Sequence, residues 1–300
     1  MKPVRTYAAI IFLSACMLLT TATAGCRASA TPRGLQILRL TQDRGVEVSD
    51  DRGESWDDFN RGLPDSITPL HITADRNKTL YLATRHSGIY RRTQSDETWR
   101  PLNSPKFRLR TTVLKDGRFR KVTAFSVNGT NPSVMSLATK HNIYRSRDGG
   151  KKWTRVVTGR QLPSRHYITA LAFSETGNDL VTGTSFGGVF VEHGRGFIGR
   201  SRGLPSEPYS KTLTFIEEIG TLHSGPGKAL FAGINFTGDV FISRNQGRSW
   251  KNAGLPGTGN RFDFVYDITS SGNTVYASSS RGIYEMDFRT GQWKKSIYDS

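Results

Sequence analysis

The chain has 300 residues, a formal net charge of +17 and only two cysteines. Both cysteines, Cys16 and Cys26, precede the part expected to fold, which excludes a domain held together by disulfides. The remaining residues, about 270 in number, suffice for one domain with a large core, and the basic balance favours an anionic partner.

Residues 1–26 have the pattern of an export signal. Lys2 and Arg5 precede an almost wholly apolar run over 7–19, and small residues follow. A membrane-spanning helix needs about 20 apolar residues, so this run is too short to be one. We therefore expect export to the periplasm or cell envelope.

Two kinds of cleavage site are readable in this segment. The residues ending at Ala24 fit ordinary signal peptidase, whereas those ending at Cys26 and Cys16 resemble bacterial lipoboxes. Lipidation of Cys26 is favoured, because modification of Cys16 would leave an apolar stretch in the mature protein. We then expect a short linker over 27–34 and one folded unit over 35–300.

A β-rich motif recurs six times in the folded part, at spacings of about 40–55 residues. Each copy follows another β-rich run and precedes a large aromatic side chain. The copies begin at Gly45, Gly88, Asn142, Gly188, Asp239 and Gly282. The aromatics include all five tryptophans: Trp56, Trp99, Trp153, Trp250 and Trp293, with Phe197 in the remaining copy.

The repeat predicts a six-bladed β-propeller. Each unit contains four short runs of strand-forming residues separated by turn residues, and no helical periodicity interrupts them. Four strands every 40–50 residues or so are typical of a propeller blade, so we expect an all-β fold of four-stranded antiparallel blades. The first blade lacks an obvious innermost strand. Residues 27–34 or the C-terminal tail would complete it, or it has three strands.

Three repeats share a turn in which Ser, Asp or Asn, Gly and Trp have fixed spacing. The acidic or amide side chain is expected to accept hydrogen bonds from turn amides, while the glycine supplies a positive φ. The tryptophan is expected to pack against the neighbouring blade. We interpret all of these residues as structural: Ser49, Asp51, Gly53, Trp56, Ser146, Asp148, Gly150, Trp153, Ser243, Asn245, Gly247 and Trp250.

These turns resemble the Asp-box, or BNR, repeats of bacterial sialidases, sortilin-type receptors, xyloglucanases and photosystem II assembly factors. Degenerate copies ending at Trp99 and Trp293 extend the resemblance over essentially the whole folded part. The resemblance implies a propeller, and the similarity to exported assembly factors implies a role in binding or assembly. Those factors usually have seven blades, whereas six repeats are found in this sequence.

Two short motifs imitate catalytic signatures. Residues 183–187 match a nucleophile elbow and residues 194–199 match a dinucleotide-binding fingerprint. Both signatures require a helix after the turn, and a strand is expected after each of these. We interpret both as ordinary turns between strands.

No set of catalytic or metal-binding residues is evident. The sequence lacks the Arg-Ile-Pro motif of sialidases, and the six histidines show no metal-ligand spacing. A glycosidase needs two carboxyl groups about 5–9.5 Å apart, and only Glu217, Glu218, Asp263 and Asp267 lie near innermost strands. Glu217 and Glu218 would point to opposite faces of a strand. We expect a protein without catalysis, cofactor or metal, the alternative being a carbohydrate-active enzyme or lectin.

The positive charge gathers on one predicted face, made by the turns between second and third strands and by the links between blades. Its largest cluster surrounds a predicted turn at 115–117. We expect the following residues to bind a partner: Lys106, Arg108, Arg110, Lys115, Arg118, Arg120 and Lys121 from this cluster, with Arg85, Lys140 and Arg281 from other turns.

The expected partner is an acidic protein or an anionic glycan, with Phe186 and Phe236 as apolar anchors on the same face. A lipid anchor would add contact with the membrane. Nucleic acid suits the charge but not the expected compartment.

Overall fold

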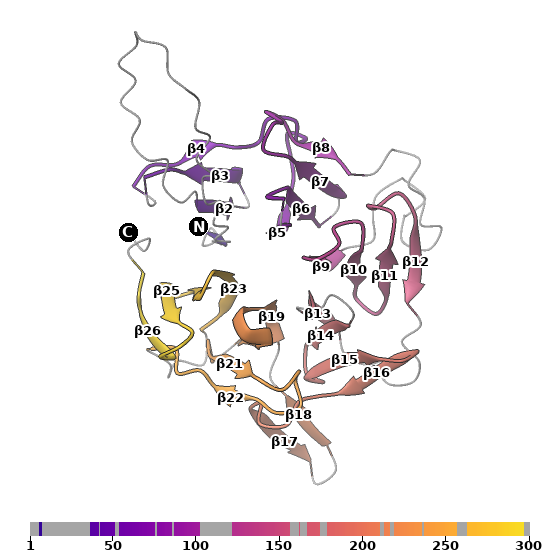
Figure 1. The fold of residues 1–300 in the computed structure, drawn as a ribbon, viewed down its shortest axis with the longest axis vertical. Coiled ribbons are helices and arrows are strands. Elements are labelled where there is room, and N and C mark those ends of the chain that lie inside the picture. The colour runs from indigo at the N-terminus through magenta and orange to yellow at the C-terminus, as the bar shows by residue number, and fades with distance from the viewer. Residues whose placement is uncertain are drawn as a thin grey trace.

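The protein is described by a computed structural model. It describes residues 6–7, 37–41, 43–51, 54–75, 77–85, 87–102, 122–156, 162, 167–174, 179–210, 213–216, 219–235, 237–256 and 263–296. Six four-stranded antiparallel sheets are arranged around a common centre, which confirms the predicted six-bladed, all-β propeller (Figure 1).

The first three blades run outward from the centre in chain order. Blade 1 comprises β1 (Thr6–Tyr7), β2 (Ile37–Thr41), β3 (Gly45–Ser49) and β4 (Asp57–Asp58). Blade 2 comprises β5 (Pro69–Ala74), β6 (Leu80–Thr84), β7 (Ile89–Arg92) and β8 (Arg100–Pro101). Blade 3 comprises β9 (Val122–Val127), β10 (Met135–Thr139), β11 (Ile143–Ser146) and β12 (Trp153–Val156).

The other three blades repeat this order. Blade 4 comprises β13 (Ile168–Phe173), β14 (Leu180–Thr184), β15 (Val189–His193) and β16 (Gly196–Gly199). Blade 5 comprises β19 (Ile219–Ser224), β20 (Leu230–Ile234), β21 (Val240–Ser243) and β22 (Lys251–Asn252), with a short 3-10 helix η1 (Pro226–Lys228) between β19 and β20. Blade 6 comprises β23 (Val265–Ser271), β24 (Thr274–Ser279), β25 (Gly282–Asp287) and β26 (Gln292–Lys295).

The core lies between the blades. Every residue of the second strands β6, β10, β14 and β20 is buried, because a neighbouring blade covers each face of the sheet. The short outermost strands β4, β8 and β22 are exposed. Apolar side chains of adjacent blades interdigitate in five large clusters. Packing between blades, rather than within them, therefore supplies most of the apolar burial.

The ring closes differently between blades 6 and 1. Among the described residues, the apolar cluster there has only two buried members, Ile37 and Ile283, with Trp56 packed against them. The innermost strand of blade 1 is Thr6–Tyr7, which pairs with Leu40 and Thr41.

This strand corrects the expectation that residues 27–34, or the C-terminal tail, complete the first blade. Residues 27–34 and 297–300 lie outside the described part of the chain. The inner edge of β2 presents backbone donors and acceptors that need partners, and Thr6–Tyr7 pairs with them. Cleavage at the predicted signal-peptidase site would remove this strand and leave three in blade 1.

The turn between β11 and β12 shows how the repeated turn is held. The Asp148 carboxylate accepts hydrogen bonds from the Lys152 amide at 2.9 Å and from the Ser146 hydroxyl at 2.8 Å. Ser146 Oγ in turn accepts from the Gly150 amide, where φ is +87°. These bonds, with the Lys152 amide contributing most, lower the pKa of Asp148.

In the two other turns, the Asp or Asn side chain accepts equivalent hydrogen bonds. Asp51 accepts from Ser55 and from the Ser49 hydroxyl, and these bonds lower its pKa to about 2. Asn245 accepts from the Ser249 amide and the Ser243 hydroxyl, both at 2.9 Å. The Asp51 and Asp148 carboxylates and the Asn245 amide thus stabilise their turns. Gly53 lies outside the described residues.

The tryptophans join each blade to the one before it. Trp250 donates from Nε1 to the Arg200 carbonyl of blade 4 at 2.7 Å, and its own amide donates to the Arg202 carbonyl. Gly203, at φ +90°, lies so close that a Cβ there would sit 2.3 Å from the Trp250 carbonyl oxygen. Gly62 and Trp99 repeat the contact between blades 1 and 2.

Both imitations of catalytic motifs are turns. Residues 183–187 lead from β14 into β15, and the Ser185 hydroxyl accepts a hydrogen bond from the Tyr167 amide at 3.0 Å. Residues 194–199 form the turn and second strand of the hairpin β15–β16. No helix follows either motif, as the sequence predicted.

One element was not expected from the sequence. A two-stranded hairpin, β17 (Ser206–Ser210) and β18 (Leu213–Ile216), projects outward between blades 4 and 5 (Figure 1). Nowhere in the described residues is there a helix long and apolar enough to cross a bilayer.

Candidate functional site at the mouth of the central channel

The innermost strands share an irregularity at one end. In five blades one extra residue is inserted where the first strand pairs with the second, so the register shifts by one. Such a bulge turns the extra side chain out of the regular alternation. The five inserted residues, which we call the bulge ring, are Leu70, Thr123, Thr169, Gly220 and Tyr266.

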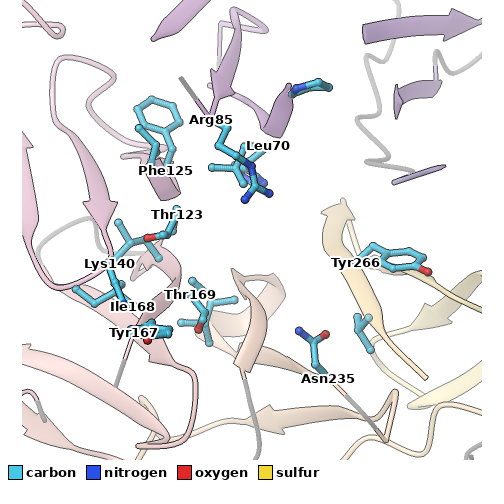
Figure 2. A pocket seen from close by; sticks show the side chains of 18 of the residues that line it. Leu70, Arg85, Thr123, Phe125, Lys140, Tyr167, Ile168, Thr169, Asn235 and Tyr266 are labelled. Atoms are coloured by element: carbon cyan, nitrogen blue, oxygen red, sulfur yellow. The ribbon is translucent and has the colours of Figure 1, made fainter. Parts of the chain in front are cut away.

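Four members of the bulge ring line a cavity of about 720 Å³, which we call the mouth pocket. It opens on the face made by the turns between second and third strands, where Arg85, Lys140 and Asn235 also line it (Figure 2). The volume lies within the usual range for ligand sites, about 300–1,000 Å³. The bulges therefore direct side chains into a pocket at the predicted basic face.

Arg85 supplies a cation that is unpaired within the described part of the chain. Two hydrogen bonds hold its backbone. The Arg85 amide donates to the Thr68 carbonyl, and the Arg85 carbonyl accepts from the Val122 amide. Its side chain points into the mouth pocket (Figure 2) and is only partly exposed. Among the described residues, its guanidinium has neither an ion pair nor a hydrogen bond. A partly desolvated cation without a counter-ion favours an anionic ligand.

Lys140 adds a second cation to the same pocket. Its ammonium lies 3.9 Å from the centre of the Tyr167 ring, on which it stacks. Tyr167 is 44% exposed and also contacts His141 edge-on, with ring centres 5.5 Å apart. This contact positions the Lys140 charge at the rim without neutralising it.

Two hydroxyl groups in the pocket have no partner among the residues that the structure describes. Thr123 and Thr169 belong to neighbouring innermost strands, and their Oγ1 atoms are buried without a hydrogen bond in the described part of the molecule. A buried hydroxyl without a partner costs about 1–3 kcal/mol. A polar ligand would supply the missing bonds.

The opposite wall of the pocket is more apolar. Phe264, Val265 and Tyr266 come from blade 6, and Asn235 comes from the turn after β20. Figure 2 shows Tyr266 across the opening from Lys140 and Thr169. Hence the cations and the threonine hydroxyls lie on blades 2–4, together with the rings of Phe125 and Tyr167, whereas blade 6 contributes Phe264 and Tyr266.

The predicted partner-binding residues have different fates. Arg85 and Lys140 both line the mouth pocket. Arg281 does not line it: its guanidinium pairs with Asp263 at 3.3 Å and donates to the carbonyls of Pro256 and Gly238. That side chain thus joins blades 5 and 6.

The largest predicted basic cluster cannot be placed. Lys106, Arg108, Arg110, Lys115, Arg118, Arg120 and Lys121 lie outside the described residues, as do Phe236 and Cys26. Phe186 is 44% exposed, as expected for an anchor.

The four acids considered for glycoside hydrolysis do not form a described pair. Glu217 and Glu218 lie outside the described side chains, and Asp263 is paired with Arg281. Asp267 lines a second cavity of about 380 Å³, the far pocket, at the other end of the channel. In the described lining of the mouth pocket there is no Asp or Glu.

The far pocket contains titratable groups on three innermost strands. Burial lowers the pKa of His71 and of His223 to about 4, and the proximity of His71 adds to the effect on His223. His223 Nε2 lies 2.8 Å from the Ser270 hydroxyl. Burial raises the pKa of Asp267 to about 8. Within the described residues, no three His, Cys, Asp or Glu side chains are grouped to hold a metal ion.

These shifts predict a stability maximum near pH 6.5. Between pH 4 and 6.5 the two histidines are protonated in the unfolded chain but neutral in the folded protein, whereas Asp267 is protonated only in the folded protein. The unfolded chain therefore binds one proton more than the folded protein, and stability rises with pH. Above that, only Asp267 contributes: the folded state keeps its proton until about pH 8, and stability falls.

Urea unfolding across this pH range would measure the profile. Asp267→Asn should abolish the fall above pH 6.5 while keeping the rise below it. A wild-type stability that keeps rising to pH 8 would contradict the prediction.

Sequence reasoning identified Arg85 and Lys140 but missed the threonines and the bulges. A bulge depends on how two strands pair, and no residue type marks it. The one available signal was alignment of the six repeats, which places polar Thr123 and Thr169 at the position of Leu70.

No protein-family model and no curated protein matches the sequence. Several solved structures resemble the protein. The extracellular domain of a one-component system from B. thetaiotaomicron is 15% identical with a TM-score of 0.59, and the match covers 97% of this chain and 33% of that one. This chain thus spans about a third of the length of that protein.

Two further structures match in a larger share of their own length. A chain of the nidogen/laminin complex is 11% identical with a TM-score of 0.54, over 87% of this chain and 89% of that one. YCF48 bound to D1 peptide is 14% identical with a TM-score of 0.51, over 87% of this chain and 77% of that one. At such identities the similarity shows the fold alone: the protein has the propeller fold of extracellular and peptide-bound neighbours, without a demonstrated sequence family.

Proposed function

We propose that this protein is a non-enzymatic binding scaffold of the cell envelope that docks an acidic protein or an anionic glycan on its basic face. The guanidinium of Arg85 in the mouth pocket, which has no partner among the described residues, carries the proposal. Lys140 supports it, because its charge lies at the same opening. Fold neighbours in the extracellular space, and one with a bound peptide, agree with such a role.

The lining of the mouth pocket favours binding over hydrolysis. Its described side chains offer two cations and several hydroxyl and aromatic groups, but no carboxylate to act as acid, base or nucleophile. Export and a lipid anchor at Cys26 are part of the proposal, and they would hold the basic face near partners at the membrane.

The test is capture of partners from solubilised envelope by the full-length protein and by Arg85→Glu. Reversing a charge that pairs with the partner in a partly desolvated pocket should weaken binding about a hundredfold, because the partner's anion then faces a like charge. Binding by the unmodified protein should also weaken with salt.

Arg147→Glu is the matched control. Arg147 is exposed in the turn between β11 and β12, on the opposite face, and its replacement changes net charge equally. The same partner recovered equally by both variants and by the unmodified protein would refute docking at the mouth pocket.

A further inference from the structure

We propose that the mouth pocket takes a peptide segment in which an acidic side chain neighbours an apolar one, and that the bulge ring determines this specificity. The inference rests on the proposed function and narrows its partner from any anion to a polypeptide.

The ring has a polar arc and an apolar arc. Thr123 and Thr169 are neighbours on blades 3 and 4, whereas Tyr266 and Leu70 lie on blades 6 and 2, on either side of blade 1. Gly220, on blade 5, contributes no side chain. A ligand entering the ring therefore meets the two threonine hydroxyls on one side and the Tyr266 ring and Leu70 on the other.

The polar arc suits a peptide backbone. A threonine hydroxyl both donates and accepts, and the amide groups of an extended peptide offer acceptors and donors in alternation. The buried Oγ1 atoms of Thr123 and Thr169 have no partner among the described residues. Arg85, in the β6–β7 turn of blade 2 next to blade 3, also lines the pocket and would hold the acidic side chain through its two-pronged guanidinium.

The deeper walls oppose a polysaccharide. Below the ring the pocket is lined by Phe125, Leu171 and Leu222. Sugar hydroxyls brought here would lose water without gaining partners, which is unfavourable. An apolar side chain would instead leave water for an apolar surface. The same pocket thus rejects a uniformly polar anion and accepts an anion joined to an apolar group.

The experiment measures binding of the full-length protein to immobilised short peptides on a Gly/Ser background. One peptide carries an adjacent Leu and Glu, a second replaces this Leu by Ser, and a third replaces the Glu by Gln. Immobilised polygalacturonate represents the anionic glycan. We expect the Leu-Glu peptide to bind about tenfold more tightly than either altered peptide or the polysaccharide, because each loses one of two contacts.

The variant Thr123→Val/Thr169→Val tests the ring. Removing unpartnered hydroxyls should leave the fold as stable as before or more so, yet weaken the Leu-Glu peptide about tenfold. Thr182→Val is the control: Thr182 is buried in β14 with an unpartnered hydroxyl, but it does not line the mouth pocket. It should leave peptide binding unchanged. Arg85→Glu completes the set.

Three outcomes separate the inference from the function on which it rests. A stable double-valine variant with weakened Leu-Glu binding supports the inference. Equal binding of the Ser-Glu peptide or polygalacturonate, lost in Arg85→Glu, overturns it and leaves docking of anions at the mouth intact. Binding of all probes that is indifferent to Arg85→Glu overturns both.

Discussion

Replacing Trp99 by alanine should lower the free energy of unfolding by about 3–5 kcal/mol. Trp99 is 2% exposed between blades 1 and 2. Its ring meets Phe59 edge-on at 6.0 Å, and its Nε1 donates to the Phe59 carbonyl at 2.7 Å. The substitution removes a large apolar group from a closed layer and leaves that carbonyl without its partner. Urea denaturation would measure the loss.

Trp56→Ala is the control at the same position of the repeat. Trp56 is only partly buried, beside Ile37 and Ile283 in the small cluster between blades 6 and 1. Its replacement should therefore destabilise the protein much less. Equal losses for the two variants would mean that the described packing does not set the contribution of each tryptophan.

Glu192→Ala should also lower the free energy of unfolding by about 3–5 kcal/mol, because it strands a buried cation. Arg145 of blade 3 donates two hydrogen bonds to Glu192 of blade 4, at 3.0 and 2.7 Å. The two side chains are 10% and 15% exposed, and Glu192 also accepts from the Leu180 amide. The pair thus fixes one blade against the next.

The double variant Arg145→Met/Glu192→Met tests whether the loss in Glu192→Ala comes from leaving a buried charge without a partner. Two apolar side chains of similar length should restore most of the stability lost in Glu192→Ala, since neither leaves a charge without a partner. Unfolding of all three proteins in urea gives the comparison. If Glu192→Ala costs less than about 1 kcal/mol, water reaches Arg145 and the explanation fails.

The packed layers between blades also position the mouth pocket. Thr123 and Thr169 lie on the innermost strands of blades 3 and 4, which Arg145 and Glu192 join. A change in the angle between these blades would move the two hydroxyls relative to each other. Loss of the ion pair should therefore weaken ligand binding as well as stability.

The amino-acid sequence by itself determined the architecture. Strand-forming runs, turn residues and the tryptophans recur at blade spacing, and each is a local property that does not depend on distant contacts. The same holds for the turns at Asp51, Asp148 and Asn245, whose bonds reach only a few residues along the chain. The sequence also predicted one basic face, because blade topology assigns each turn to a side; of its ten predicted residues, Arg85 and Lys140 line the mouth pocket.

Only the tertiary structure decided which charges are available. Arg85 and Arg281 occupy equivalent turns and look alike in sequence. Arg85 faces the mouth pocket without a partner among the described residues, whereas Arg281 meets Asp263 and two carbonyls from another blade. These contacts join residues up to 43 positions apart, so no local sequence pattern indicates them.

The bulge ring and the innermost strand of blade 1, Thr6–Tyr7, were likewise decided only by the tertiary structure. A bulge is a one-residue shift between two strands, and it moves Thr123 and Thr169 into the mouth pocket without any change in composition. Thr6–Tyr7 completes blade 1 from far along the chain, because the edge of β2 requires a partner and the sequence does not say which segment supplies it. Pairing between distant strands, not residue type, decides both features.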